Sequence, residues 1–287
     1  MPDQRHAGST SGSAPAEPAD RWAAAPPLLR ELLALADELA HDAGRAHVEG
    51  LRHALRTETK SSPTDLVSQV DKESERLIVS RLRERRPDDG LLGEEGARSQ
   101  GTSGVRWVID PLDGTTNYVY GYPAFAVSIG IEIEGRPTIG VVLDSSAGRT
   151  YRAISGFGAA CDDEPLQARR ETDLSQALVA TGFSYDAAQR VRQGATAAQV
   201  LGRVRDIRRG GTAALDLCHV AAGHVDAYWE LDLSPWDYAA GGVIASEAGA
   251  EVVLAKAAHG HRPAVIAANP ALMPAVLDLL RETGALA

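Results

Sequence analysis

The chain has 287 residues, 44% of them hydrophobic, which is enough for one large domain or two small ones. Its formal net charge of −10 disfavours non-specific binding to nucleic acid or to anionic membranes. Two cysteines exclude a disulfide scaffold. Because no apolar run approaches the roughly 20 residues of a membrane span and the N-terminus lacks an apolar signal core, we expect a cytoplasmic protein.

The first elements in chain order are a tail and two helices. Residues 1–27 are rich in Ala, Pro, Ser and Gly and lack hydrophobic periodicity, which predicts a disordered tail. From Leu28 onward leucine and alanine recur at helical spacing, which predicts a long first helix. We expect a short extended or turn segment over residues 65–70 and a second helix over residues 72–86.

The middle of the chain is predicted to be mostly β. Residues 125–134 alternate and end at Gly135, and an apolar run follows over residues 138–143, a pattern typical of a hairpin. Residues 150–154 and 159–161 are predicted to be further antiparallel strands.

The second half is predicted to alternate helices with strands. We expect helices over residues 189–204, 212–222 and 238–248 and a terminal helix opened by Pro270, with strands over residues 178–181, 225–230, 251–254 and 265–268. Runs of strands followed by such alternation indicate stacked sheet and helix layers, a mixture of α+β and α/β organisation. The prediction is a single domain over residues 28–287, with an N-terminal half over 28–180 and a C-terminal half over 181–287.

The most informative segment for function is an acidic loop, residues 110–117, which follows an apolar run. Its two aspartates, Asp110 and Asp113, and its carbonyl groups suit Mg²⁺ or Mn²⁺ better than zinc. Gly114 lets the backbone approach an anion closely, because it has no Cβ. If Thr115 opens a short helix, the first N–H groups form an anion site. The loop therefore suggests metal-assisted chemistry on a phosphate ester, although a single Asp-x-x-Asp pair is more often a solvated turn.

Two distant acidic residues strengthen this interpretation. Glu94 ends a short apolar run, and Asp237 opens an alanine- and glycine-rich helix, where negative charge is favoured. With Asp110 and Asp113 they would form an acidic cup. Like charges about 4 Å apart repel by roughly 4 kcal/mol at an effective dielectric near 20, against a total fold stability of about 5–15 kcal/mol. Four converging carboxylates therefore imply divalent cations.

These residues resemble the inositol monophosphatase family, one of the lithium-sensitive, magnesium-dependent phosphatases. The resemblance runs from about Leu28 to the C-terminus and is especially close to the actinobacterial enzymes. It is carried by six motifs in one order: residues 60–65 with Asp71, 93–95, 110–117, 211–213, 226–230 and 236–241. It implies a layered α-β-α-β-α sandwich, and the layer count comes from the resemblance and not from periodicity.

The resemblance also implies a magnesium site with two to three ions and possible replacement by Mn²⁺. One ion would bind Glu94, Asp110 and the backbone carbonyl of Leu112; the second would bind Asp110, Asp113 and Asp237; a third, weaker ion would lie near Glu94. The implied reaction is attack of a metal-activated water on a phosphate monoester, without a covalent phosphoenzyme.

Around the attacking water the resemblance implies three catalytic residues. Thr115 would bond that water, and Glu94 and Asp71 are the candidate proton acceptors. Lys60 is expected to balance charge near the acidic cup, the alternative being a surface lysine. Glu95 is expected either to support the metal site or to be a solvated turn residue.

The implied substrate contacts lie on the leaving-group side as well as at the phosphate. They are Asp113, Gly114, Thr115, Gly211, Thr212, Ala213, Glu230 and Asp237. Glu230 could accept hydrogen bonds from adjacent hydroxyls, which suits inositol. Tyr118 occupies a position where many family members carry Phe.

Other reactive side chains are interpreted as structural. The eight histidines are scattered, and His259 with His261 lacks the partners of a zinc site. Cys218 lies in an apolar helical stretch and is interpreted as a buried small hydrophobe. A basic cluster at Arg203, Arg205, Arg208 and Arg209 is interpreted as a solvated face or dimer rim, with contact to phosphate or nucleic acid as the alternative.

The leading interpretation is a cytosolic, lithium-sensitive inositol-1-phosphate phosphatase that forms a homodimer. Histidinol phosphate is an alternative substrate for the same chemistry. A 3′-phosphonucleotide or fructose 1,6-bisphosphate would need a second anion pocket, which the sequence does not clearly show. A regulatory, RNA-linked role of the same fold is the alternative of another class, and the complete acidic set argues against loss of catalysis.

Overall fold

The computed structural model describes residues 21–52, 57–59 and 66–287. Its helices are α1 (Pro27–Gly50), α2 (Gln69–Arg85), α3 (Thr115–Tyr120), α4 (Ala187–Leu201), α5 (Ala213–Ala221), α6 (Pro235–Glu247) and α7 (Met273–Glu282). Its strands are β1 (Thr57–Thr59), β2 (Leu66–Ser68), β3 (Gly90–Gly93), β4 (Arg98–Ser99), β5 (Val105–Asp113), β6 (Ala126–Ile133), β7 (Arg136–Asp144), β8 (Arg149–Ile154), β9 (Ala159–Cys161), β10 (Glu164–Pro165), β11 (Leu178–Thr181), β12 (Asp206–Arg208), β13 (Ala227–Leu231), β14 (Glu251–Lys256) and β15 (Pro263–Ala268).

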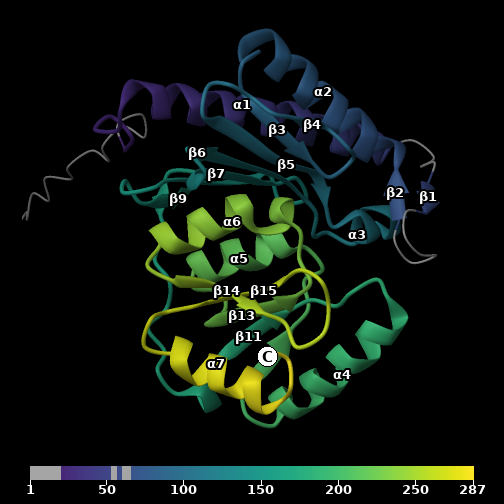
Figure 1. The fold of residues 1–287 in the computed structure, drawn as a ribbon, viewed down its shortest axis with the longest axis vertical. Helices are drawn as coiled ribbons and strands as arrows, with labels where there is room; N and C mark the ends of the chain where they lie inside the picture. The colour runs from purple at the N-terminus through teal and green to yellow at the C-terminus, as the bar shows by residue number, and fades with distance from the viewer. Residues whose placement is uncertain (1–20, 53–56, 60–65) are drawn as a thin grey trace, which may run out of the picture.

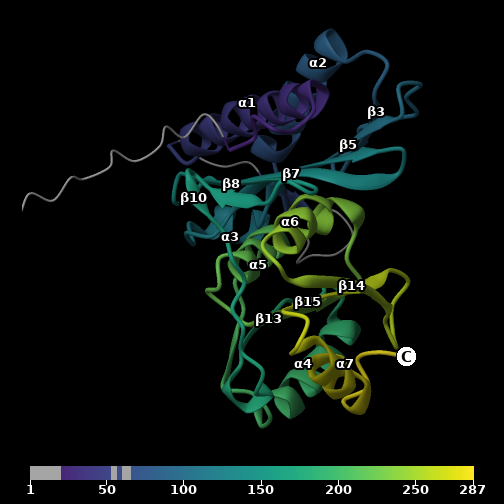
Figure 2. The same cartoon turned by 90° about the vertical axis from the view of Figure 1, so that its left-hand side faces the viewer.

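The elements stack in five alternating layers (Figure 1). Helices α1 and α2 cover one face of an eight-stranded sheet, whose order is β10-β9-β8-β7-β6-β5-β3-β4. Helices α5 and α6 lie between this sheet and a five-stranded sheet of order β12-β11-β13-β15-β14. Helices α4 and α7 cover the far face of the second sheet. The predicted α-β-α-β-α sandwich is therefore confirmed, and the same layers are visible after a quarter turn (Figure 2).

The first core forms where the leucine face of α1 meets the eight-stranded sheet. Leu32 and Leu39 are fully buried in one cluster with Ile78 of α2 and with Trp107 and Ile129 of the sheet. Such burial contributes about 25 cal/mol per Å² of apolar surface removed from water. The helical spacing of the leucines thus fixes which face of α1 turns inward.

The strand predictions for the middle of the chain are confirmed with small boundary shifts. The hairpin of β6 and β7 turns at Glu134 and Gly135, with φ of 50° and 73°. Positive φ at both central residues gives a turn whose twist matches that of the strands. The strands predicted in the second half correspond to β11, β13, β14 and β15, whereas β12 was not predicted.

Several predicted boundaries differ from the structure. The disordered tail was expected to reach residue 27, but Ala25 is 3% exposed and Trp22 packs against the first core. The expected division at residues 180 and 181 falls inside β11, which belongs wholly to the second sheet. Within the described residues, no helix combines the length and apolar character needed to cross a membrane.

Pro270 does not open the terminal helix, so that prediction was wrong. The side-chain oxygen of Asn269 accepts hydrogen bonds from the N–H groups of Ala271 (3.0 Å) and Leu272 (3.1 Å). These bonds have the pattern of a helix N-cap, and the Met273 N–H also donates to the Asn269 carbonyl at 3.0 Å, so a single turn over residues 269–272 leads into α7, which begins at Met273. Pro274 then takes the early helical position that proline tolerates.

Candidate active site

A cavity of about 600 Å³ is lined by residues of both sheets and of the middle helical layer. Its acidic lining residues are Glu94, Asp110, Asp113, Asp186, Glu230, Asp232 and Asp237. Its basic and aromatic lining residues are Arg209, His261, Arg262, Phe183, Tyr185 and Trp236. The four members of the predicted acidic cup therefore meet in one cavity.

A bulge in β5 brings Asp110 and Asp113 to the same face of the first sheet. Asp110 pairs with Ser128 of β6, and Asp113 pairs with Ala126, so three steps along β5 match two steps along β6. In a regular strand, residues three apart point to opposite faces. The extra residue in β5 shifts the alternation of side chains by one position, as β-bulges do, so Asp113 points to the same face as Asp110. Both carboxylates consequently face α5 and α6.

Close packing of α6 on the first sheet places Asp237. A Cβ on Gly130 of β6 would lie 2.6 Å from the Cβ of Ala239, and a Cβ on Gly140 of β7 would overlap the backbone of Ala240. The glycines are therefore needed for the helix to lie this near the strands. Asp237 Oδ2 accepts a 2.6 Å hydrogen bond from the Ser234 N–H, which fixes the side chain in the first turn.

Strand β3 runs parallel to β5 and delivers Glu94. The Glu94 N–H donates to the Ile109 carbonyl at 3.1 Å, which continues the strand pairing up to the carboxylates. Below this turn, the Glu75 carboxylate of α2 accepts from the N–H groups of Glu95 (2.9 Å) and Ala97 (3.0 Å). Glu75 thus positions the Glu94 turn, a role that its place in a charged helical run did not reveal.

Burial, together with the charges of neighbouring carboxylates, raises the pKa of Asp110, Asp113 and Asp237. Burial raises the pKa of Asp110 well above its usual range, and the charges of Glu94, Asp113 and Asp237 add to the shift. Burial, followed by the charges of Glu94 and Asp113, likewise raises the pKa of Asp237. Burial raises the pKa of Asp113 to about 7, although hydrogen bonds from Thr212 and Ala214 oppose the shift. The site therefore concentrates negative charge that a cation would stabilise.

The donor chemistry of these side chains fits Mg²⁺. Asp113 Oδ2 is held by the Thr212 hydroxyl and by the Ala214 N–H, and Asp110 Oδ1 by the Leu112 N–H. Within the described part of the chain, Oδ1 of Asp113 and of Asp237 accepts no hydrogen bond, which leaves hard oxygen donors for the cavity. Among the described residues, no three His, Cys, Asp or Glu side chains already lie in positions from which they could all bind one metal ion. The fit rests on donor chemistry and not on preset ligand distances.

Thr115 connects the cavity to Asp71. Helix α3 begins at Thr115, directly after Gly114, whose φ of 90° is a left-handed conformation. A Cβ on Gly114 would lie 2.9 Å from the Ala124 carbonyl oxygen. The Thr115 hydroxyl donates to Asp71 Oδ1 at 2.8 Å, and Asp71 is fully buried in the first turn of α2.

A buried histidine supports the acidic loop from the side of α1. His47 Nε2 lies 2.9 Å from the Pro111 carbonyl oxygen, and Nδ1 lies 3.0 Å from Ser145 Oγ. Burial lowers the pKa of His47 to about 4, so the ring is neutral at pH 7. The Tyr118 hydroxyl donates to the His47 carbonyl at 2.7 Å. The Tyr118 hydroxyl, which Phe lacks, therefore connects α3 to α1. The sequence alone did not assign a role to this hydroxyl.

The opposite wall comes from the second half of the chain. Gly211, Ala213 and Glu230 line the cavity, and Tyr228 donates its hydroxyl to Glu230 Oε2 at 2.9 Å. Burial raises the pKa of Glu230 to about 7. Asn117 Nδ2 joins this wall to the acidic loop, because it donates to the carbonyls of Ala124 (2.8 Å) and Gly210 (2.9 Å).

A family model described as the inositol monophosphatase family matches residues 28–285. This chain belongs to the inositol monophosphatase family. The "Inositol-1-monophosphatase" of Mycobacterium leprae (strain TN) is 47% identical over 239 residues, 79% of this chain and 82% of that protein. The "Inositol-1-monophosphatase SuhB" of Mycobacterium tuberculosis (strain ATCC 25618 / H37Rv) is 43% identical over 271 residues, 88% and 93% of the two chains. The solved structure of "Mycobacterium tuberculosis SuhB" has a TM-score of 0.76 at 40% identity and covers 90% of this chain and 98% of its own.

Not every residue that the family resemblance singled out lines the cavity. Thr212, predicted to contact substrate, is 3% exposed; it donates to Asp113 and caps α5 by accepting from the Leu215 N–H at 3.3 Å. The side chain of Thr212 therefore supports Asp113, and the predicted contact of the Thr212 backbone with substrate stays a prediction. Asp71 and Glu95 also lie outside the lining, and Lys60 lies outside the described residues.

Sequence analysis did not identify every residue that lines this cavity. Arg209 was grouped with a surface cluster, yet its side chain reaches the cavity, whereas Arg203 and Arg208 pair with Glu282 (3.1 Å) and Asp206 (2.6 Å). The one feature of the sequence that distinguishes Arg209 from the neighbouring arginines is its position two residues before Gly211. Tyr185 comes from the connection between β11 and α4 and was not predicted.

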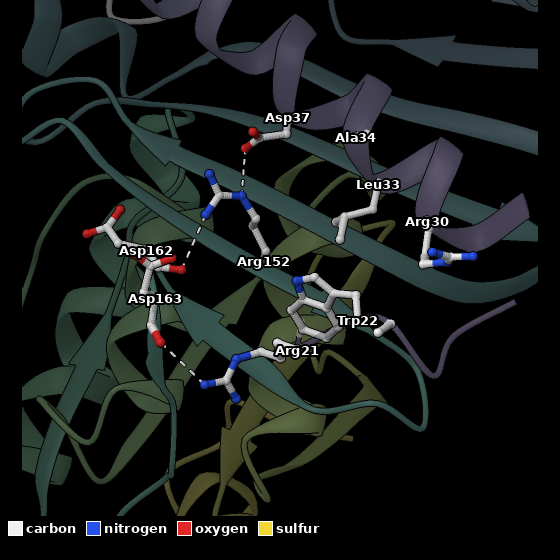
Figure 3. Close-up of a pocket in the computed structure, with 10 residues that line it drawn as sticks. Arg21, Trp22, Arg30, Leu33, Ala34, Asp37, Arg152, Asp162 and Asp163 are labelled. Atoms are coloured by element: carbon white, nitrogen blue, oxygen red, sulfur yellow. Dashed lines mark hydrogen bonds and ion pairs between the residues drawn. The ribbon is translucent and has the colours of Figure 1, made fainter. Parts of the chain in front are cut away.

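A second large groove, of about 650 Å³, lies on another part of the family fold, beside the N-terminal end of α1 (Figure 3). Its charges are largely satisfied within the groove: Arg152 Nε lies 2.7 Å from Asp37 Oδ1, and Arg21 donates to the Asp163 carbonyl at 3.3 Å. Two of its lining carboxylates, Asp162 and Asp163, are exposed and do not converge in a buried cluster. We therefore assign the chemistry to the acidic cavity, although it is slightly smaller.

Proposed function

We propose that this protein hydrolyses inositol 1-phosphate, or a closely similar polyol phosphate, to the free polyol and inorganic phosphate in the presence of Mg²⁺. The main support for this proposal is that one cavity, beside the Gly114 turn, is lined by Glu94, Asp110, Asp113 and Asp237. The family membership supports the same reaction, since the mycobacterial relatives are inositol-1-monophosphatases.

In this proposal the ligands of one ion are Glu94, Asp110 and the Leu112 carbonyl, and those of a second ion are Asp110, Asp113 and Asp237. Bound divalent cations supply charge neutralisation at the phosphate and make the attacking water more acidic. Mn²⁺ could replace Mg²⁺ because the donors are hard oxygens.

The protein residues position and deprotonate the attacking water. Thr115 accepts a hydrogen bond from that water while its own proton is held by Asp71, at 2.8 Å. Glu94 is the second candidate base at the cavity. The water oxygen bonds to phosphorus as the bond from phosphorus to the polyol oxygen breaks, and the departing oxygen takes up a proton.

The polyol lies against the opposite wall. Glu230 accepts hydrogen bonds from adjacent ring hydroxyls, and the backbone of Gly211 and Ala213 borders the ring. Asp113 has Oδ2 fixed by Thr212 and Ala214, so its remaining oxygen keeps one direction toward the site. Preorganisation of this kind reduces the cost of ordering the site when substrate binds.

Phosphate release from a panel of monoesters, with and without millimolar Mg²⁺, tests the proposal. We expect Mg²⁺-dependent release from inositol 1-phosphate, inhibition by lithium, and slower release from histidinol phosphate. Faster release from histidinol phosphate would change the substrate and keep the chemistry. If no monoester released phosphate, the catalytic proposal would fail and the regulatory alternative would gain. Glu230→Gln should mainly raise KM for inositol 1-phosphate.

A cytosolic location and a homodimer complete the proposal. The homodimer can be tested by light scattering of the purified full-length chain, with a mass near twice 30.3 kDa expected. A mass near 30.3 kDa at micromolar concentration would contradict it.

A further inference from the structure

Two arginines, Arg209 and Arg262, border the cavity that contains Glu230. Arg209 precedes α5, and Arg262 precedes β15; both line the cavity and are exposed. Among the described residues, neither guanidinium takes part in an ion pair or a side-chain hydrogen bond. Three neighbouring arginines differ: Arg203 and Arg208 are held by carboxylates, and Arg205 donates to the Gln176 carbonyl at 2.8 Å.

The side chain of Arg209 packs beside the backbone of Gly211. Its guanidinium lies against Gly211, since a Cβ on Gly211 would overlap Arg209 Nη1. Burial raises the pKa of Glu230 to about 7 and that of Tyr185 to about 12, and the positive charge of Arg209 opposes part of both shifts, which places Arg209 near these two side chains. Asp216, 3% exposed beneath this wall, also lies within the field of Arg209.

A carboxylate holds the loop that carries Arg262. Asp232 Oδ1 accepts from the N–H groups of His261 (3.0 Å) and Arg262 (2.9 Å). Asp232 itself has φ of 68°, a left-handed conformation that a non-glycine residue adopts only where its surroundings require it. Because Asp232 follows Glu230 by two residues, this turn places Arg262 beside the part of the cavity wall that contains Glu230.

We propose that Arg209 and Arg262 form a second anion subsite, so that the cavity hydrolyses polyols carrying two phosphate groups. This inference rests on the proposed function. One phosphate lies at the acidic cup and is released by water, while the second stays on the polyol product against the two guanidiniums. The fork of an arginine side chain matches a phosphate with two parallel hydrogen bonds. In a chain of net charge −10, two guanidiniums at the cavity that pair with no carboxylate among the described residues also offset the repulsion of a polyanionic substrate.

The test compares inositol 1,4-bisphosphate with inositol 1-phosphate as substrates of the full-length protein at fixed Mg²⁺ and ionic strength. We expect KM to be lower for the bisphosphate. Arg209→Gln and Arg262→Gln should each raise KM for the bisphosphate about tenfold and change kcat/KM for the monophosphate less than threefold. Arg209→Lys should restore only part of the loss, because it keeps the charge and lacks the fork.

Arg208→Gln is the matched control, because it removes the same charge from an exposed arginine that already pairs with Asp206. It should leave KM unchanged for both substrates. Equal KM values for the two substrates, or equal effects of Arg208→Gln and Arg209→Gln, would overturn the inference. The proposed function would still stand if inositol 1-phosphate released phosphate. Release from neither substrate would overturn both. Light scattering of each variant would show whether a change in assembly explains its KM.

Discussion

Thr115 donates its hydroxyl proton to Asp71 across 2.8 Å, which connects the acidic loop to the first turn of α2. Only Thr115 of the two lines the cavity, and in the proposed mechanism Asp71 acts on the reaction through Thr115. We expect Thr115→Val to lower kcat about 10²–10³-fold with KM changed little, since a positioned proton acceptor contributes on that order. Thr115→Ser should retain most of the activity. Steady-state phosphate release measures both, and a Val variant as active as the Ser variant would remove Thr115 from the mechanism.

Asp113→Asn should abolish turnover without unfolding the protein. The Asn carbonyl oxygen can still accept from Thr212 and Ala214, while the cavity loses one of its four clustered carboxylates. We expect at least a hundredfold loss of kcat and a smaller rise of Tm on adding Mg²⁺, since ligand binding stabilises the folded state by mass action. Asp278→Asn, on the exposed side of α7, removes the same charge and should change neither quantity. Near-normal activity of Asp113→Asn would show that the ligand assignment is incorrect.

Glu230 makes the stability of the metal-free protein depend on pH. Burial raises its pKa from 4.5 to about 7 in the folded state. The folded protein therefore holds a proton that the unfolded chain has released, and stability falls as pH rises from about 4.5 to 7, by up to about 3 kcal/mol. Glu230→Gln should reduce this slope. The pKa of Asp113 is also raised to about 7, so part of the slope remains. Urea unfolding in a chelator at pH 5, 6 and 7 measures it; identical slopes in both proteins would contradict the prediction.

His47 should matter for stability and for activity through Pro111. His47→Ala leaves the Pro111 carbonyl and Ser145 Oγ without their partner in a buried site, which we expect to cost roughly 3 kcal/mol. Because Pro111 lies between the two aspartates of the acidic loop, kcat should also fall. His41→Ala on the same helix is the control, since its ring is 41% exposed. Denaturant midpoints of the three proteins provide the comparison, and equal midpoints for both variants would show that His47 does not support the loop.

Gly114 and Gly121 allow a matched test of the turn before α3. Both have positive φ, 90° and 69°, but a Cβ on Gly114 meets the Ala124 carbonyl, whereas a Cβ on Gly121 meets no atom within 4 Å among the described residues. Gly121→Ala should cost about 1–2 kcal/mol from the left-handed conformation alone. Gly114→Ala should cost more and reduce turnover, because the backbone must shift beside the carboxylates. Equal stability and equal activity of the two variants would argue against a close approach at Gly114.

The sequence by itself determined the layered class, most elements and the residues of the acidic cup. Leucines at helical spacing predicted α1, and alternation before Gly135 predicted the β6–β7 hairpin, because these periods depend only on local geometry. Glu94, Asp110, Asp113 and Asp237 could be named from the motifs that they share with the family, before any contact between them was known.

Tertiary structure alone decided how those residues act. The spacing of Asp110 and Asp113 predicts opposite faces of a strand, and only the unequal pairing of β5 with β6 turns both into the cavity. Arg209 resembles its surface neighbours in sequence, yet the turn before α5 directs it to the site. His47 carries no motif, but the packing of α1 brings it to Pro111. For the two aspartates and for His47 the deciding contact joins segments far apart along the chain, so no local pattern could encode it.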